Sequence, residues 1–399
     1  MKRALEEATT NVQSFSFGKI NTESDSMQTW DVKELITFRL ERGQGEDTST
    51  TNNNAAIFHA SYLNQVFGES EVVRGRGSKP AVTVIIEADT LRYRLPEKPT
   101  LDGNAQEVVD ALTFRTVSAC LDQPLFPTLS ADLSTETWAP FGECIEKYEC
   151  QGREFEVWWS RCGDDKAAEE RGYHLRAQIL ALLLIDGASY IDVDDPNWEV
   201  FYVYEVAGTR RFLAGFTTIY RFPVPIGGDV QDRVRVSQVV VLPPFQRQGH
   251  GNHLYGLVHK EADRCGAFEV TVEDPAPGMV ALRDSFDANR YVGFARGKAW
   301  EMDAPPEAAV VAEALRVPKA QAQRCIDLVR WKMLQGKQDA AKQEAGEKAF
   351  RLGVKRRLHK AHFSASIPTD QDEKKRVLAE LYDLMVEEFR RVERKVLRV

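Results

Sequence analysis

Residues 235–259 constrain the fold of this chain more than any other stretch. They begin with a run rich in β-branched residues, which favours a strand, and then reach two consecutive prolines, Pro243 and Pro244. Because proline has no backbone N–H to donate, this pair ends sheet pairing. Apolar residues then recur at helical spacing from Gly249 to about Cys265. The order of strand, glycine-containing turn and amphipathic helix predicts an α/β unit.

The turn has the features of an anion site. Gly249 and Gly251 lack side chains, so a ligand can approach the backbone closely. The first turn of the following helix has N–H groups without partners inside the helix, which suits a pyrophosphate. No lysine follows Gly251 as a Walker loop requires, and the GxGxxG of dinucleotide-binding folds is incomplete. The remaining pattern, Gln246-x-x-Gly249-x-Gly251, is similar to the [QR]xxGx[GA] acetyl-CoA motif of the GNAT acetyltransferases.

Several separated blocks resemble the type-B histone acetyltransferases, which belong to the GNAT superfamily. SQVVVLPPFQRQGHG, followed by EDP and LRD, is similar to that family in wording and in order. The resemblance continues through FGESE (67–71), ASYIDVDDPNW (188–198) and FRLGVKRRL (350–358), so it covers most of the chain. It implies an α+β or α/β fold with a GNAT core, a mixed N-terminal domain and a helical C-terminal region.

The pattern of hydrophobic residues predicts the following organisation. We expect a flexible N-terminus (1–28), a mixed α/β domain (29–141), an α/β domain (142–304) and a helical domain (305–399). The resemblance implies that 29–141 contributes to histone binding and that 142–304 is the catalytic acetyl-CoA-binding domain. Strands are expected within 29–42 and at 81–89, 155–159, 199–205, 212–222, 235–242 and 268–272. Helices are expected from 106, over 174–187 and 249–265, and from near Thr369, whose spacing to Asp372 is that of a capping box. Residues 43–54 form a polar low-complexity loop.

Charge and cysteine usage exclude several classes of protein. With 52 Lys and Arg against 60 Asp and Glu, the net charge is −8, which argues against a duplex-DNA partner. It suits a basic partner, but mild acidity is also an ordinary aid to solubility. None of the six cysteines forms a CxxC pair, so we expect no metal site. The N-terminus lacks a signal-peptide core and the longest apolar run is too short for a bilayer, so we expect a soluble intracellular protein. The family resemblance implies a location in cytoplasm and nucleus.

Acyl transfer to lysine needs a base. A lysine amine has a pKa near 10.4, so roughly one in two thousand is neutral at pH 7, and restoring the nucleophile costs roughly 4–5 kcal/mol. The resemblance implies that Glu273 is this base and that Asp274 is its acidic neighbour. It implies a third carboxylate where the chain has Asp186, which is one methylene shorter than the family's usual glutamate. The alternative is that Glu273 and Asp274 lie at a solvated strand end before Pro275.

The resemblance also assigns the ligand-binding residues. A backbone N–H near Val240 and Val241 would stabilise the oxyanion of the tetrahedral intermediate. The expected acetyl-CoA residues are Val239, Val240, Val241, Gln246, Arg247, Gln248, Gly249, His250, Gly251 and Asn252. The expected histone-binding residues are Glu69, Glu71, Trp198, Tyr220, Arg221 and Phe222. The aromatic members also fit half-buried strand positions.

The implied partners are the tail of histone H4, free or with histone H3, and a WD-repeat β-propeller that chaperones histones, with no direct contact to DNA or membrane. Two other functions stay open: a GNAT enzyme acting on a small amine or another protein, and an escort that binds acetyl-CoA without transferring it. The basic run at 355–357 is consistent with a nuclear-import signal and equally with a solvated helical face.

Overall fold

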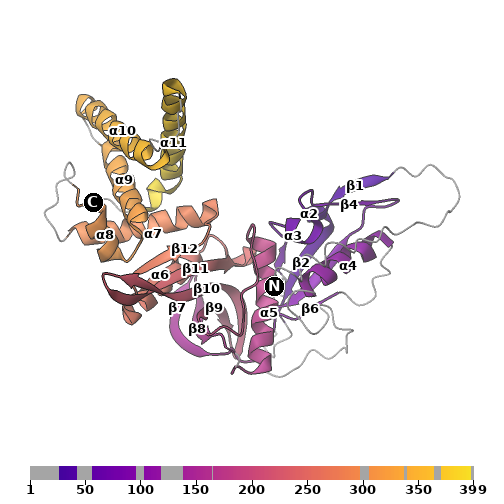
Figure 1. Cartoon of the computed structure of the whole chain (residues 1–399). Helices are drawn as coiled ribbons and strands as arrows, with labels where there is room; N and C mark the ends of the chain where they lie inside the picture. Colours follow the sequence, from indigo (N-terminus) through magenta and orange to yellow (C-terminus); the bar gives the residue numbers. More distant parts are fainter. Residues whose placement is uncertain are drawn as a thin grey trace.

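The computed structural model describes residues 27–42, 56–95, 103–117, 138–163, 165–296, 305–336, 339–363 and 370–396. Its elements form an N-terminal unit, a central sheet and a group of C-terminal helices (Figure 1). Residues 1–26, the polar loop at 43–54, Cys120 and Thr369 lie outside the described residues, and so do the expectations for them.

The N-terminal unit contains two small sheets. One pairs β1 (Gln28–Asp31) with β4 (Val72–Gly75), and the other has the order β3-β2-β5-β6, formed by Ala56–Phe58, Ile36–Glu41, Val82–Glu87 and Tyr93–Arg94. The short helix α3 (Asn64–Phe67) and the longer α4 (Gly103–Val117) complete the unit. The strand expected within 29–42 is interrupted by the helical turn α2 (Val32–Leu35), because the Asp31 side chain accepts a hydrogen bond from the N–H of Lys33 and caps it.

The central sheet has six strands in the order β12-β11-β10-β9-β8-β7. They are β7 (Glu143–Cys150), β8 (Arg153–Arg161), β9 (Trp198–Ala207), β10 (Arg210–Ile226), β11 (Asp229–Val241) and β12 (Glu269–Val272). Neighbours pair antiparallel except β11 and β12, which are parallel because α6 (His250–Cys265) crosses between them. The strands expected from the sequence are confirmed, each with shifted ends, while β7 was not expected.

Two helices cover opposite faces of this sheet. Alternate residues of a strand point to opposite faces. On one face, His174 of α5 (Ala168–Leu184) hydrogen-bonds the Tyr202 hydroxyl of β9 at 2.7 Å. On the other face, Glu261 of α6 reaches Arg221 of β10. We refer to these as the α5 face and the α6 face.

The N-terminal unit and the central sheet share one continuous hydrophobic core that extends from Trp30 to Val270. The backbone N–H groups of Ser61 and Tyr62 donate to the carbonyl of Leu183, at the end of α5. The N–H of Leu213 in β10 donates to the carbonyl of Ala88, just after β5. These contacts place residues 61–62 beside the C-terminal end of α5 and residue 88 beside β10.

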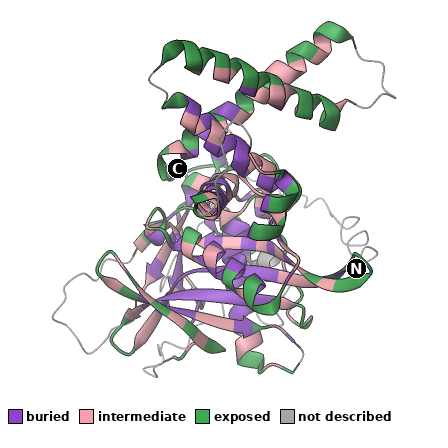
Figure 2. Cartoon of the chain, turned by 90° about the vertical axis from the view of Figure 1, so that its left-hand side faces the viewer, coloured by how far each residue is buried: buried purple, intermediate pink, exposed green. Residues whose placement is uncertain are grey.

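The C-terminal helices have a second core. It involves α7 (Pro277–Arg296), α8 (Ala308–Leu315), α9 (Lys319–Gln335), α10 (Ala340–His362) and α11 (Gln371–Val392). The helices α10 and α11 form a hairpin that projects from α9, and most of its surface is exposed (Figure 2). The last helix begins at Gln371, close to the expected start, and Asp370 caps it by accepting from the N–H groups of Asp372 and Glu373.

The expected fold class is confirmed: mixed sheets in the N-terminal unit, a central α/β unit and a helical C-terminal region. Within the described part of the chain, no helix combines the length and apolarity needed to cross a membrane.

Candidate active site

The turn between β11 and α6 exposes backbone at a helix start. After the single 3-10 turn at Pro243–Phe245, Gly249 adopts φ +102° and serves as the N-cap of α6. A Cβ at Gly249 would meet no atom within 4 Å, so the turn is open on that side. Among the described residues, no side chain caps this helix. Its first N–H groups therefore favour an anion, as the glycine pattern predicts.

Side chains from β7 and β8 hold the turn in place. The Cys150 thiol donates to the Gln248 carbonyl at 3.1 Å, and Arg153 donates to the Gln248 side chain. The His250 ring lies 2.6 Å from the Tyr148 hydroxyl. Burial, with the nearby Arg153, lowers the pKa of His250 to about 4, so its imidazole is neutral at physiological pH. The contacts from Tyr148 and Cys150 were not foreseen, because β7 has no buried face that would mark it as a strand in the sequence.

The two parallel strands of the central sheet, β11 and its edge neighbour β12, separate before β11 reaches this turn. Pairing of β11 with β12 ends at Val236 and Val272, and the N–H of Glu273 then donates to the Val236 carbonyl at 2.9 Å. The strand β11 continues to Val241. In the described ranges no strand pairs with this edge of β11 beyond Val236. An unpaired strand edge can bind the amide groups of an extended ligand.

Of the expected acetyl-CoA residues, the three valines of β11 divide between the faces of the sheet. Val240 is buried on the α5 face, while Val239 and Val241 are half-buried on the α6 face. The Gln246 amide donates to the Val241 carbonyl at 2.9 Å, and Arg247 and Gly249 are exposed. The structure therefore brings the end of β11 and the turn together.

Glu273 lies where β11 and β12 separate. A register shift between Thr218 and Ile219 makes Ser237 an extra residue in β11, and such a bulge re-aims nearby side chains. The Ser237 hydroxyl donates to Oε2 of Glu273 at 2.7 Å, and Nη1 of Arg235 lies 3.4 Å from its Oε1. The Glu273 side chain remains 38% exposed, so water and substrate can reach it. Asp274 is exposed, with φ +32°.

Asp186 lies in the loop that follows α5, and its side chain is exposed. The Asn64 amide approaches its Oδ1 at 3.4 Å. The loop is held by Gln238, which donates to the Ser189 carbonyl at 2.7 Å, and by Gln65, which donates to the Ala188 carbonyl at 2.7 Å. Because Gln238 follows Ser237 in the bulge, the loop of Asp186 adjoins the segment that contacts Glu273.

An aromatic surface on the α5 face extends from Glu273. The rings of Trp198 and Tyr220 lie 4.8 Å apart. The Arg235 guanidinium lies 5.8 Å from the centre of the Tyr220 ring and 5.7 Å from that of Phe222. A hydrogen bond with Asp195 raises the pKa of Tyr220. Three of the expected histone-binding residues thus share one surface with the candidate base, and Arg235 links them to it.

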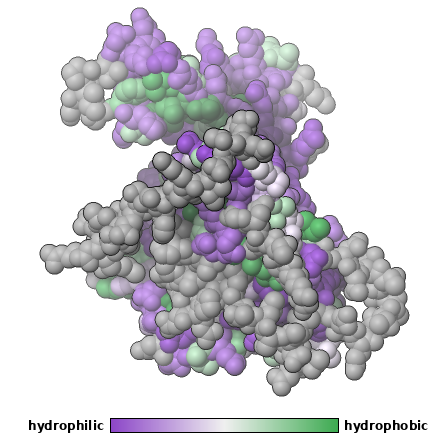
Figure 3. All heavy atoms as spheres, turned by 90° about the vertical axis from the view of Figure 1, so that its right-hand side faces the viewer, coloured by the Kyte–Doolittle hydropathy of each residue, from purple (hydrophilic) through white to green (hydrophobic). Residues whose placement is uncertain are grey.

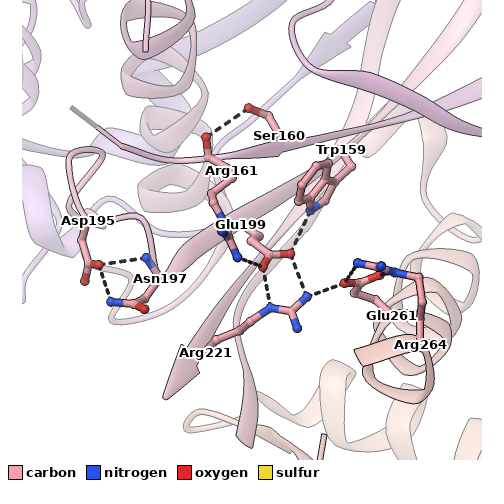
Figure 4. A network of polar contacts seen from close by, with 9 residues as sticks. All are labelled: Trp159, Ser160, Arg161, Asp195, Asn197, Glu199, Arg221, Glu261 and Arg264. Carbon is pink, nitrogen blue, oxygen red and sulfur yellow. Dashed lines mark hydrogen bonds and ion pairs between the residues drawn. The ribbon is translucent and has the colours of Figure 1, made fainter. Parts of the chain in front are cut away.

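Arg221 is not part of this surface. Strand alternation points it to the α6 face, opposite to Tyr220 and Phe222. There its Nε donates to Glu199 at 2.5 Å, and its guanidinium also pairs with Glu261 (Figure 4). The Glu199 side chain has no exposed surface, and Trp159 donates to it at 2.8 Å. Arg221 therefore neutralises a buried carboxylate.

Replacing Arg221 by methionine should lower the free energy of unfolding by about 3–5 kcal/mol, because Glu199 would remain charged and buried without its main partner. Urea denaturation of the variant would measure this loss. Arg221→Lys keeps a positive charge, so its free energy of unfolding should fall by less. If Arg221→Met unfolds at the same urea concentration as the wild type but has a higher KM for a histone peptide, Arg221 contacts the substrate and the structural role given to it here is wrong.

Glu71 also has a partner inside the protein. Its Oε1 accepts from the N–H of Leu63 at 2.6 Å, and its Oε2 pairs with Lys33. Although partial burial opposes the change, the Lys33 hydrogen bond lowers the pKa of Glu71. Glu69, two residues earlier, is exposed. Of the two glutamates expected to bind histone, Glu69 is the one available to a ligand.

Comparisons with known proteins agree with the family suggested by the sequence blocks. The family described as "Histone acetyl transferase HAT1 N-terminus" matches residues 28–186. A histone acetyltransferase type B catalytic subunit of Dictyostelium discoideum is 27% identical over 360 residues, covering 84% of this chain and 75% of that protein. The Kluyveromyces lactis catalytic subunit is 24% identical over 386 residues, covering 90% and 93%. Among solved structures, an aminoglycoside acetyltransferase from a soil metagenomic sample is 16% identical, covering 36% of this chain and 91% of that chain, with a TM-score of 0.24.

Proposed function

We propose that this chain, which is similar to the type-B histone acetyltransferase catalytic subunits, is an acyltransferase of that class and transfers acetyl from acetyl-CoA to lysines of newly made histone H4. The observation that carries this proposal is the position of Glu273. Its carboxylate lies where β11 leaves β12, between the unpaired strand edge and the aromatic surface. A base at that point can serve two substrates that approach from opposite sides.

The proposed reaction is direct transfer within a ternary complex. Glu273 accepts the proton of the lysine ammonium, directly or through water, and the neutral amine then attacks the acetyl carbonyl. A backbone N–H of the unpaired β11 edge, near Val240 and Val241, donates to the developing oxyanion. The C–S bond breaks, and the thiolate of CoA takes a proton as it leaves. Ser237 and Arg235 hold the carboxylate in place.

The proposed acetyl-CoA site fits the residues present. The pantetheine amides would pair with the β11 edge beyond Val236, and the pyrophosphate would meet the N–H groups of residues 249–252. The open space at Gly249 and its left-handed φ support this placement. Nothing in the proposed reaction calls for a metal ion.

The histone tail is proposed to bind along the aromatic surface of Trp198, Tyr220 and Phe222. An extended tail rich in glycine and lysine presents little steric hindrance beside such a surface. Asp195 hydrogen-bonds Tyr220 of this surface, and Glu69 is an exposed carboxylate of the N-terminal unit. Each exposed carboxylate contributes only about 0.2–1 kcal/mol, so they guide the tail more than they hold it. The proposal extends to a WD-repeat histone chaperone as partner and to a location in cytoplasm and nucleus, on the family resemblance alone.

Activity should be high on free histone H4, or on its dimer with H3, and at least about tenfold lower in kcat/KM on nucleosomes at equal concentration. In a nucleosome the tail lysines are drawn to DNA phosphates, and a protein of net charge −8 is repelled by the same DNA. Mass spectrometry of acetylated H4 from both substrates would measure the ratio. Equal kcat/KM at physiological salt would contradict the type-B assignment. Faster turnover of spermidine than of an H4 tail peptide would favour a small-amine acetyltransferase.

A further inference from the structure

The basic run Lys355-Arg356-Arg357 lies inside helix α10, so its side chains point in three directions. The ammonium of Lys355 lies 5.8 Å from the ring centre of Tyr382 in α11. Arg357 pairs with Asp327 of α9, a carboxylate with 6% exposed surface. Of the three, Arg356 is exposed and makes neither a ring contact nor an ion pair among the described residues. A nuclear-import signal read as an extended basic peptide would require this helix to unfold.

Arg356 belongs to a different set of side chains. Lys348, Leu352, Arg356, His359 and Lys360 are all exposed, and we call them the basic stripe. Their spacing of three or four residues places them on one face of α10 over about 18 Å. The opposite side of the helix carries Phe350 and Val354, which are buried in the C-terminal core. The stripe therefore faces away from the rest of the protein.

Within the described residues, no ion pair involves Lys348, Arg356 or Lys360 of the basic stripe. On the neighbouring helix α11, Lys375, Arg376 and Arg391 each pair with a carboxylate one turn away. Hydrophilic side chains cover most of the hairpin in Figure 3. Four cationic or titratable side chains on one exposed helix face are complementary to an acidic partner.

An apolar side chain in the middle of the stripe favours a protein over a nucleic acid. Leu352 is 44% exposed and lies one turn from both Lys348 and Arg356. Phosphates would pair with the cations but leave this leucine in water, whereas an acidic segment with apolar residues at helical spacing would cover it. The hairpin projects away from the central sheet (Figure 1), so such a partner would not obstruct the aromatic surface.

We propose that the basic stripe of α10 docks an acidic, amphipathic segment of a partner protein. A histone tail is itself basic and cannot be this occupant. The stripe can therefore be filled while substrate binds elsewhere on the chain. The proposal does not depend on acetyl transfer.

The test uses the full-length chain and a synthetic peptide of about 20 residues, rich in glutamate with leucine at every fourth position. Fluorescence anisotropy at about 0.15 M salt, where charges are screened over roughly 8 Å, would measure its affinity. Arg356→Glu with Lys360→Glu should weaken binding at least about tenfold. Lys375→Glu with Arg391→Glu on α11 changes the net charge equally and should change affinity less than about twofold. Unaltered circular dichroism and acetyltransferase activity would show that both variants are folded.

A variant of Leu352 distinguishes a protein partner from a nucleic acid. Leu352→Ser should weaken binding of the leucine-containing peptide about threefold or more, and should not affect the same peptide with alanine in place of leucine. The proposal is overturned if the wild-type chain does not bind the peptide, or if the charge reversals on α10 and α11 have equal effects. Tighter binding to a 20-base-pair DNA duplex than to the peptide would also overturn it and identify the stripe as a nucleic-acid contact.

Discussion

Glu273→Gln is expected to lower kcat on an H4 tail peptide by about 10²–10⁴, the usual contribution of a general base. The amide has nearly the shape of the carboxylate, and its oxygen can still accept the hydrogen bond that Ser237 donates at 2.7 Å. Affinity for acetyl-CoA and peptide should therefore stay close to that of the wild type. The deficit should shrink as the pH rises, because a larger fraction of the lysine is then already neutral.

Asp274→Asn is the matched control for that variant. Asp274 is the next residue, is exposed, and would lose the same charge. If Glu273 is the base, Asp274→Asn should lower kcat less than about tenfold. A Glu273→Gln enzyme with near-normal kcat at pH 7 would move the base to another carboxylate, with Asp274 and Asp186 as the candidates.

Gly249→Asp should weaken acetyl-CoA binding about 100-fold or more while the domain stays folded. The side chain would enter open space, so no clash arises within the protein. Its charge would stand against the pyrophosphate. Two unit charges about 6 Å apart at an effective dielectric of about 20 repel by roughly 2.8 kcal/mol, which is about a hundredfold. Isothermal titration calorimetry with acetyl-CoA would measure the loss.

Gly249→Asn separates charge from backbone strain. Asparagine has the size of aspartate and adopts positive φ with similar ease, so both variants strain the φ of +102° alike. The asparagine variant should retain most of the affinity that the aspartate variant loses. Equal losses in the two would assign the effect to the backbone. Unchanged affinity in Gly249→Asp would remove the pyrophosphate from this turn.

The sequence predicted the elements that have a clear hydrophobic period and missed those that do not. The strands β8 to β11 and the helix α6 bury regular apolar faces, so their patterns were visible. The edge strand β7 is exposed or half-buried along its whole length and has no such face. Helix α7 was not predicted, because its buried positions include the charged residues Asp284 and Asp287. In the structure, Arg324 and Gln321 of α9 contact these two carboxylates. Only the tertiary structure provides those partners.

The candidate site was predicted to a different extent in each part. The glycine turn follows from local sequence rules, and the structure has it at the start of α6. Arg221 was expected to bind histone beside Tyr220 and Phe222, but strand alternation places it on the opposite face, against Glu199. The roles of Ser237 and Arg235 were not predictable, since they depend on a bulge in β11 that no sequence pattern marks. The internal partners of Glu71, Lys33 and Leu63, could not be foreseen because they lie in other elements.

The shared core has a consequence for synthesis of the chain on the ribosome. Trp30 and Val84 of the N-terminal unit belong to the same hydrophobic cluster as Leu180 of α5 and Leu213 of β10. When the first hundred or so residues emerge, much of the surface that they must pack against has not been translated. Contacts so distant in sequence form slowly and leave apolar surface exposed in the meantime. The nascent N-terminal unit should therefore need a holding chaperone until α5 and the central sheet have left the exit tunnel.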